Sequence, residues 1–187
     1  MICERTLVAI DGGDPGDGRM PDHPTTAETS RRLASAAGRL SRALCSMAAL
    51  SAADGAALML AGEANGLHAV GGSTADGLEL EYAQEFERAG PTRESVAADH
   101  PVAVDDLADG AGPAYAQPAR RAAPVRAVLS VPVRLDGTVI GALDFYRRRP
   151  GTWTGGQIAL GEHLADTAAD LVARLAAHPE AHDHGRP

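Results

Sequence analysis

The side chains best suited to binding chemistry lie on two segments that alternate like neighbouring strands. Asp144 and Tyr146 fall in the apolar run 138–146, and Ser130 falls in the preceding run 126–135. A carboxylate in an apolar strand is costly unless it receives hydrogen bonds. We therefore expect Asp144 either to accept a donor from a bound ligand or to bond to backbone or to an arginine. Ser130 and Tyr146 could donate or accept bonds in the same kind of site.

Three further candidates surround a short strand predicted over residues 101–104. His100 precedes this strand and Asp105 follows it, while Tyr115 is the lone aromatic residue of the segment 107–124. His100 could contact a ligand or coordinate a haem iron, or it could be an ordinary solvated loop residue. The segment 107–124 has no clear period, and an irregular segment of that length is usually functional or disordered. It is a candidate lid, with Tyr115 as the pocket cover.

Several catalytic chemistries lack the residues that they need. The chain has no lysine, which argues against P-loop nucleotide hydrolysis, kinase-type ATP binding and pyridoxal chemistry. Residues 71–75 lack the second glycine of a nucleophile elbow, and Cys3 and Cys45 show no metal-ligand spacing. We expect no catalytic residue, metal site or cofactor, while an enzyme whose site assembles only in space stays open. A loose metal cluster in the C-terminal tail is disfavoured by the entropy of ordering its histidines, His178, His182 and His184.

The charges are distributed unevenly. The formal net charge is −8, yet seven of the 17 arginines lie within residues 120–149, where the acidic residues are Asp136 and Asp144. Solvated strand ends would explain this excess. The alternative is an anionic or phosphate-bearing ligand, because guanidinium groups bind such anions bidentately. A nucleic-acid partner is not expected, because the chain is acidic overall and only 3% aromatic.

Length and composition predict one domain with two terminal segments. Of the 187 residues, 1–24 read as a flexible segment rich in Gly, Asp and Pro, 25–177 as the domain, and 178–187 as a disordered tail. The hydrophobic share is 44%, much of it alanine, which predicts a core of small residues. No signal-peptide core or membrane span is found. We expect a cytoplasmic protein with no membrane partner.

Hydrophobic periodicity predicts three helices. One begins at Thr25, which forms a capping box with Glu28, and another runs from Thr154 to about Ala177 with two apolar stripes. A third, from about residue 73 to 89, is expected to bury Leu78, Tyr82 and Phe86 and to expose its acidic residues. The first helix carries the apolar stripe Leu33, Ala37, Leu40, Leu44 and Met47.

Two hairpins are predicted between these helices. Strands 56–61 and 67–70 flank Asn65-Gly66, and strands 126–135 and 138–146 flank the two-residue turn Asp136-Gly137. The register set by this second turn places Leu129 opposite Asp144, and Ser130 on the face opposite to Asp144 and Tyr146. Those candidates could then not line one pocket. The second strand is apolar on both faces, which predicts a layer on each side of the sheet.

Over roughly residues 28–177 the chain resembles a GAF domain, in particular the GAF half of GAF–ANTAR antitermination regulators. The resemblance rests on residues 90–95, 100–107, 128–146, 150–154 and 164–168. It implies an α+β fold with a central antiparallel sheet of about six strands. The N- and C-terminal helices would pack on one face, with loops and short helices over a ligand pocket on the other. The sequence ends about ten residues after its last expected helix, so we expect a sensor domain without the RNA-binding ANTAR domain of those regulators.

The resemblance also implies a function. We expect a non-enzymatic sensory domain for signal transduction or transcription regulation, which binds an unknown small molecule or a partner protein and acts on a separate output protein. The alternative is a scaffold without a ligand. Motifs for cyclic nucleotides, bilins and methionine sulfoxide reduction are missing, because they need lysine or pocket cysteines. The implied homodimer interface comprises Leu33, Leu40, Leu44, Met47, Leu164, Leu171 and Leu175.

Overall fold

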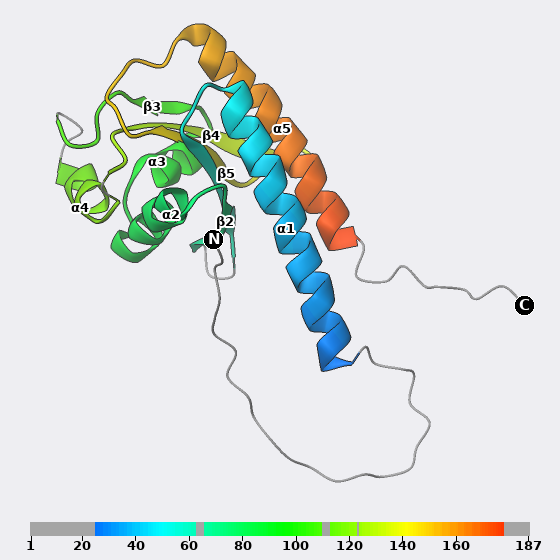
Figure 1. Cartoon of the computed structure of the whole chain (residues 1–187). Coiled ribbons are helices and arrows are strands. Elements are labelled where there is room, and N and C mark those ends of the chain that lie inside the picture. Colours follow the sequence, from blue (N-terminus) through cyan, green and yellow to red (C-terminus); the bar gives the residue numbers. More distant parts are fainter. Residues whose placement is uncertain (1–24, 63–65, 110–112, 123, 178–187) are drawn as a thin grey trace, which may run out of the picture.

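The computed structural model describes residues 25–62, 66–109, 113–122 and 124–177 (Figure 1). This part of the chain contains five helices and five strands, in the order α1-β1-β2-α2-α3-β3-α4-β4-β5-α5. The predicted terminal segments, the histidines of the tail and most of the turn around Asn65-Gly66 lie outside the described residues. The helices are α1 (Thr26–Leu50), α2 (Ala75–Glu87), α3 (Pro91–Ala98), α4 (Pro113–Arg121) and α5 (Gly155–Ala177). The strands are β1 (Gly55–Ala61), β2 (Leu67–Gly72), β3 (Val102–Val104), β4 (Ala127–Leu135) and β5 (Thr138–Arg147).

The strands form one antiparallel sheet in the order β2-β1-β5-β4-β3. The α+β fold is as predicted, with five described strands where about six were expected. The central position of β5 explains its apolar character on both faces, because both of its faces are covered by helices. The segment 107–124, which showed no period, contains the helix α4 with Pro118 inside it.

A bulge corrects the predicted register of the β4–β5 hairpin. Leu135 lies opposite Thr138, as the Asp136-Gly137 turn requires, but the pairing shifts by one residue between Val133 and Arg134. Beyond the bulge Ser130 is therefore the partner of Asp144. A shift of one residue exchanges the faces of a strand. The prediction that Ser130 and Asp144 lie on opposite faces was wrong.

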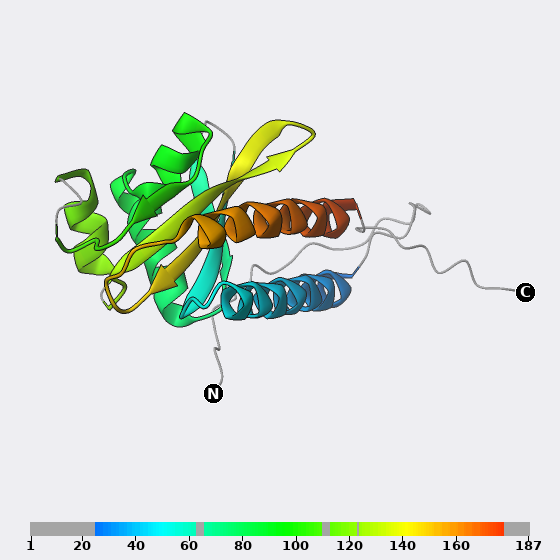
Figure 2. The ribbon, with the colours of Figure 1, turned by 90° about the horizontal axis from the view of Figure 1, so that it is seen from above.

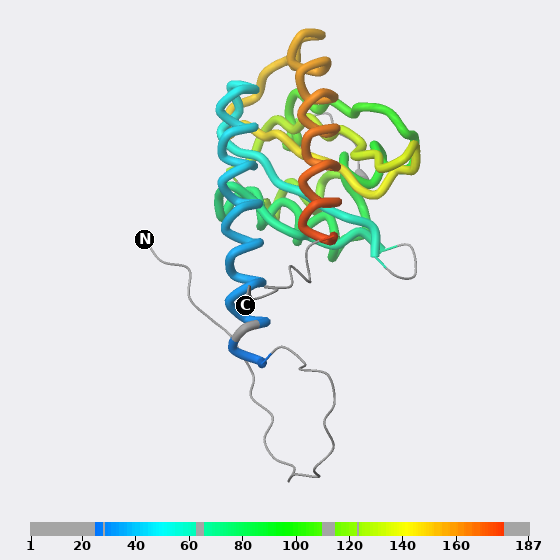
Figure 3. The backbone as a smooth tube through the Cα atoms, turned by 90° about the vertical axis from the view of Figure 1, so that its right-hand side faces the viewer, coloured from blue at the N-terminus to red at the C-terminus, as the bar shows by residue number. Residues whose placement is uncertain are grey.

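One face of the sheet is covered by α1 and α5, which lie side by side (Figure 2). The core on this face includes Leu44 of α1, Ala168 of α5 and, from the sheet, Leu129 and Phe145. In α1 the buried stripe is confined to the C-terminal half, beginning at Leu40. The N-terminal end of α1 projects past the end of α5 (Figure 3).

The opposite face is covered by α2, α3 and α4 (Figure 1). Thr74 caps α2, accepting a hydrogen bond from the Gly77 N–H at 3.3 Å, and Pro91 stands in the first turn of α3. The apolar residues of this layer form a second core, to which helices, strands and connecting segments all contribute. They are Leu80, Ala83, Val102, Val104, Leu107, Tyr115, Ala122, Val125, Val128 and Tyr146.

Candidate ligand site

The helix α2 turns a partly polar face towards the sheet. Leu80 and Ala83 are buried on it as expected of a core, but so are Glu81 and Gln84, each fully buried. The predicted burial of Tyr82 and Phe86 was wrong, because these side chains are 53% and 71% exposed. Glu81 was expected to be solvated and is instead in the interior.

The buried residues of α2 meet polar side chains from α3, β4 and β5. We call this set the polar cluster, and all of its members are fully buried: Glu81, Gln84, Thr92, Ser95, Ser130 and Asp144. They come from four elements that span more than 60 positions of sequence, which is why spacing alone could not group them. The cluster lies on the sheet face opposite to α1 and α5.

One amide joins the two carboxylates of the cluster. Gln84 Nε2 donates to Glu81 Oε2 at 3.1 Å and to Asp144 Oδ2 at 3.3 Å. The Thr92 hydroxyl also donates to Asp144 Oδ2, and the Thr92 N–H donates to Gln84 Oε1 at 2.9 Å. The amide of Gln84 is thereby held between α2, α3 and β5.

Three oxygen atoms of the cluster have no hydrogen-bond partner among the described residues. They are Glu81 Oε1, Asp144 Oδ1 and Ser130 Oγ. Ser130 is the cross-strand partner of Asp144, so its hydroxyl belongs to the same face. Buried polar atoms are nearly always satisfied in folded proteins, so three in one place mark this region as unusual.

The pKa of the Glu81 carboxyl is raised well above its ordinary value. Burial is the main cause, since it disfavours the charged form. The Asp144 carboxylate adds a like charge and accepts a hydrogen bond from the protonated Glu81 carboxyl. The hydrogen bond from Gln84 acts in the opposite direction.

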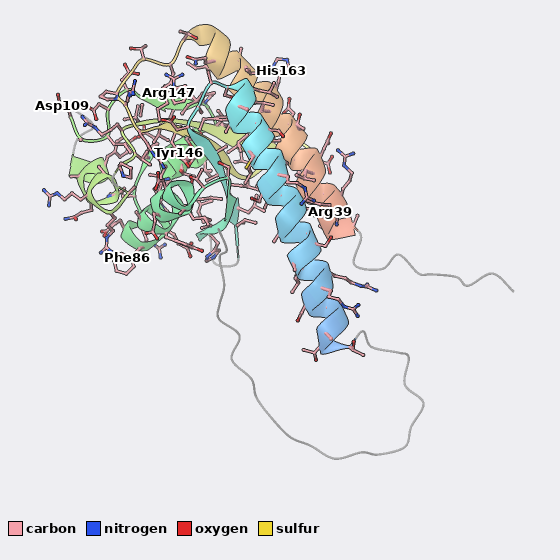
Figure 4. The ribbon with its side chains drawn as sticks, viewed as in Figure 1. Arg39, Phe86, Asp109, Tyr146, Arg147 and His163 are labelled. Carbon is pink, nitrogen blue, oxygen red and sulfur yellow. The ribbon has the colours of Figure 1, made fainter. Side chains whose placement is uncertain are left out.

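Tyr146 and Tyr115 also lie on this side of the sheet, in the apolar part of the layer. The Tyr146 hydroxyl bonds to Thr74, and the Tyr115 hydroxyl donates to Glu94. Burial is the leading cause of a raised pKa in both phenols. Figure 4 shows Tyr146 among the side chains that fill this layer, and Phe86 at its outer surface.

The structure places His100 and Asp105 away from the polar cluster. Both are exposed, and the His100 ring lies 2.9 Å from the Pro101 carbonyl oxygen. Asp105 accepts a hydrogen bond from the Thr152 hydroxyl at 3.1 Å and so ties the loop before α5 to the end of β3. Among the six predicted ligand-binding residues, Ser130 and Asp144 come together directly.

A layered sheet of this kind, with terminal helices on one face and a polar interior on the other, has known counterparts. The family model of the GAF domain matches residues 35–172. The chain belongs to the GAF domain family. GAF domains are sensory and regulatory modules that bind small ligands and often dimerise.

Solved structures share the fold at low sequence identity. The GAF domain of the cyanobacteriochrome TePixJ is 20% identical with a TM-score of 0.56, covering 83% of this chain and 99% of its own. The type II free methionine-R-sulfoxide reductase of Thermoplasma acidophilum is 20% identical with a TM-score of 0.58, covering 77% and 96%. A domain from a protein of Sinorhizobium meliloti, described as a two-component sensor histidine kinase, is 17% identical with a TM-score of 0.56, covering 73% and 90%. No curated protein matches the chain.

Five of the seven arginines in the basic segment of this GAF domain make structural contacts with the same chain. Arg126 forms a two-point ion pair with Asp106 at 2.8 and 2.5 Å, and Arg147 stacks over the Trp153 ring with its guanidinium carbon 3.9 Å from the ring centroid. Three more of the seven arginines in the basic segment pair with carboxylates of the same chain, as Arg121–Glu87, Arg134–Asp99 and Arg148–Asp76. These pairs support the interpretation of solvated strand ends over an anion site.

The predicted dimer residues divide into two groups. Leu40, Leu44, Met47 and Leu164 lie in the core of their own chain, where they pack against the sheet. Leu33 is 67% exposed, while Leu171 and Leu175 are partly buried. Of the seven predicted interface residues, Leu33, Leu171 and Leu175 therefore keep solvent-accessible surface on α1 and α5.

No group of three or more His, Cys, Asp or Glu side chains in the described part of the chain could hold a metal ion. None of the described helices combines the length and apolarity needed to cross a bilayer.

Sequence reasoning missed Glu81, Gln84 and Thr92. A signal was present, because Gly77, Leu80, Glu81 and Gln84 follow a 3.6-residue period as well as the aromatic stripe does. The aromatic stripe was preferred because Tyr and Phe are buried more often than Glu and Gln.

Proposed function

We propose that this GAF domain is a non-enzymatic sensor whose ligand binds at the polar cluster between α2, α3, β4 and β5. The observation that carries the proposal is the set of three buried oxygen atoms without partners, Glu81 Oε1, Asp144 Oδ1 and Ser130 Oγ. A ligand that supplied hydrogen bonds to them would remove a desolvation cost of about 1–3 kcal/mol for each atom. The occupant is a small molecule or a short segment of a partner protein.

The signal would pass through the sheet to the helix pair. Along β5 the side chains alternate, so Asp144 and Tyr146 face the cluster while Leu143 and Phe145 pack beneath α1 and α5. A ligand that repositions Asp144 would disturb the packing of its neighbours in the strand. We propose that the output is a changed geometry of α1 and α5 in a homodimer, with Leu33, Leu171 and Leu175 at the interface and a separate protein as its target.

An enzyme is the second candidate, because a buried pair of carboxyl groups is a common acid–base device. The contacts of the pair favour binding instead. In the described part of the chain no cysteine, histidine or lysine contacts Glu81 or Asp144. Cys45 lies exposed on α1, across the sheet from the cluster, where its thiol lies 3.7 Å from the Ser73 carbonyl oxygen.

Native mass spectrometry of the freshly purified full chain tests the proposal. A retained small molecule is expected in the parent protein and in Glu79→Gln, which removes an exposed carboxylate from the same helix. Its occupancy should fall in Asp144→Asn. If no variant retains a molecule, and NMR spectra do not change with a metabolite library, the scaffold alternative replaces this proposal.

Light scattering tests the dimer separately. The parent protein should have twice the mass of one chain, and Leu33→Arg should reduce it. A monomeric parent protein would exclude the dimer and leave the ligand site untouched.

A further inference from the structure

The polar cluster has more acceptors than donors. Two carboxylates present four oxygen atoms, and the donors that reach them are Gln84 Nε2 and the Thr92 hydroxyl. Both donors are directed to Oε2 of Glu81 or Oδ2 of Asp144, and the remaining hydrogen bond is the one that the protonated Glu81 carboxyl gives to Asp144. Once Glu81 is ionised, Oε1 and Oδ1 have no donor from any described residue. A ligand that binds with Glu81 ionised must therefore donate hydrogen bonds.

The cluster also lacks a positive charge. Neither carboxyl group has an arginine or histidine among its hydrogen-bond partners in the described chain. The charged group that acts on the pKa of Glu81 is Asp144 itself. Buried charges are normally paired. An anionic ligand would add a third like charge to this interior, so the cluster repels the class of ligand that the arginine-rich segment suggested.

The Ser130 hydroxyl adds a third oxygen atom without a partner to the site. Ser130 Oγ is fully buried, unpartnered and across the strand pair from Asp144. A hydroxyl can accept as well as donate. The site thus offers two carboxylate oxygens and one hydroxyl to a group that carries several N–H bonds.

We infer that the ligand of this domain is a small organic cation with an ammonium or guanidinium group, held between Glu81 and Asp144. This inference rests on the proposed function and adds the class of ligand. Binding would ionise Glu81 and place the positive charge against both carboxylates, with Gln84 and Thr92 keeping the carboxylates in position. A charge-assisted hydrogen bond is about twice as strong as a neutral one, so charge recognition would dominate the affinity.

The test uses three probes of similar size on the full chain: methylguanidinium chloride, methylammonium chloride and neutral N-methylurea, at constant ionic strength. Titration calorimetry should show saturable binding of at least one cation and much weaker binding of N-methylurea. The affinity for the cation should fall about tenfold in Glu81→Gln and in Asp144→Asn, since each exchanges a charged acceptor for a neutral one. Glu79→Gln is the matched control and should bind as the parent protein does.

A second readout needs no variant. Because Glu81 holds its proton more tightly than an ordinary carboxyl, a bound cation should release protons, and calorimetry in buffers of different ionisation enthalpy measures that release. The affinity should also rise with pH. N-methylurea should release none.

Three results would overturn the inference: equal binding of N-methylurea and the cations, undiminished cation binding by both cluster variants, or no binding of either cation. In each case a neutral or anionic molecule retained by the parent protein and lost in Asp144→Asn would leave the proposed function standing. No retained molecule of any kind would defeat both.

Discussion

The buried carboxyl group of Glu81 predicts an unusual dependence of stability on pH. Glu81 is fully buried, and its pKa in the folded protein lies above its ordinary value of 4.5. Between these two values the folded chain keeps a proton that the unfolded chain has lost. Stability should then fall as the pH rises, at up to about 1.4 kcal/mol per pH unit for one proton. The contribution of Glu81 is complete below pH 4.5 and is lost as the pH passes the raised pKa.

The substitution Glu81→Gln isolates this effect. Glutamine has nearly the same shape and stays neutral, and its amide can donate to Asp144 while its oxygen accepts from Gln84. We therefore expect Glu81→Gln to match the parent protein near pH 4.5 and to exceed it at neutral pH. Urea unfolding of both proteins at pH 5, 6, 7 and 8 measures the difference in the free energy of unfolding.

The decisive quantity is the difference in free energy of unfolding between the parent protein and Glu81→Gln, because Glu85 also makes the stability depend on pH. Glu85 has a lowered pKa, caused chiefly by the Ala69 N–H and then by His68, and so it removes stability as the pH falls below 4.5. The pH range in which Glu85 affects stability lies below 4.5, whereas that of Glu81 lies above 4.5. Glu85 is also present in both proteins. Glu79→Gln should follow the parent protein throughout. A difference between the parent and Glu81→Gln that does not change from pH 5 to 8 would refute the reasoning.

Two further predictions concern the frame around the cluster. Leu40→Arg should lower the free energy of unfolding by about 3 kcal/mol or more, because it buries an unpaired charge. Its control, Leu33→Arg, should change the free energy of unfolding by less than about 0.5 kcal/mol. Equal losses of stability in thermal unfolding of the two variants would contradict the burial assigned to Leu40. Gly90→Ala should cost about 2 kcal/mol or more, because φ is 131° there and an added Cβ would overlap the Gln84 side chain. Gly156→Ala, in α5 with open space around it, is its control and should be neutral or slightly stabilising.

The elements of this domain were largely predictable because their signals are local. The capping residues before α1 and the alternation around Asp136-Gly137 led to the correct helix and hairpin. The bulge between Val133 and Arg134 was not predictable from these signals, since it adds one residue to a strand without changing which residue types alternate. That one residue decided whether Ser130 joins Asp144.

The polar cluster was beyond local reasoning for a different physical reason. A glutamate on a helix is solvated unless distant residues satisfy it, and for Glu81 those residues are supplied by β5 and by the same helix one turn later. Thr92 contributes through α3, after the glycine that turns the chain at Gly90. Only the assembled fold shows that these contacts exist.

The position of the cluster sets a condition on any signal from this domain. Asp144 and Phe145 are adjacent in β5, one fully buried under α2 and α3, the other fully buried under α1 and α5. A ligand can shift the helix pair only by as much as its affinity differs between two arrangements of that strand. A change from 1:99 to 99:1 needs a difference of about 10⁴-fold. Buried carboxylates that lack hydrogen-bond donors would supply such a difference. The arrangement of the strand that places them against the donors of a ligand gains hydrogen bonds that the ligand-free arrangement does not have.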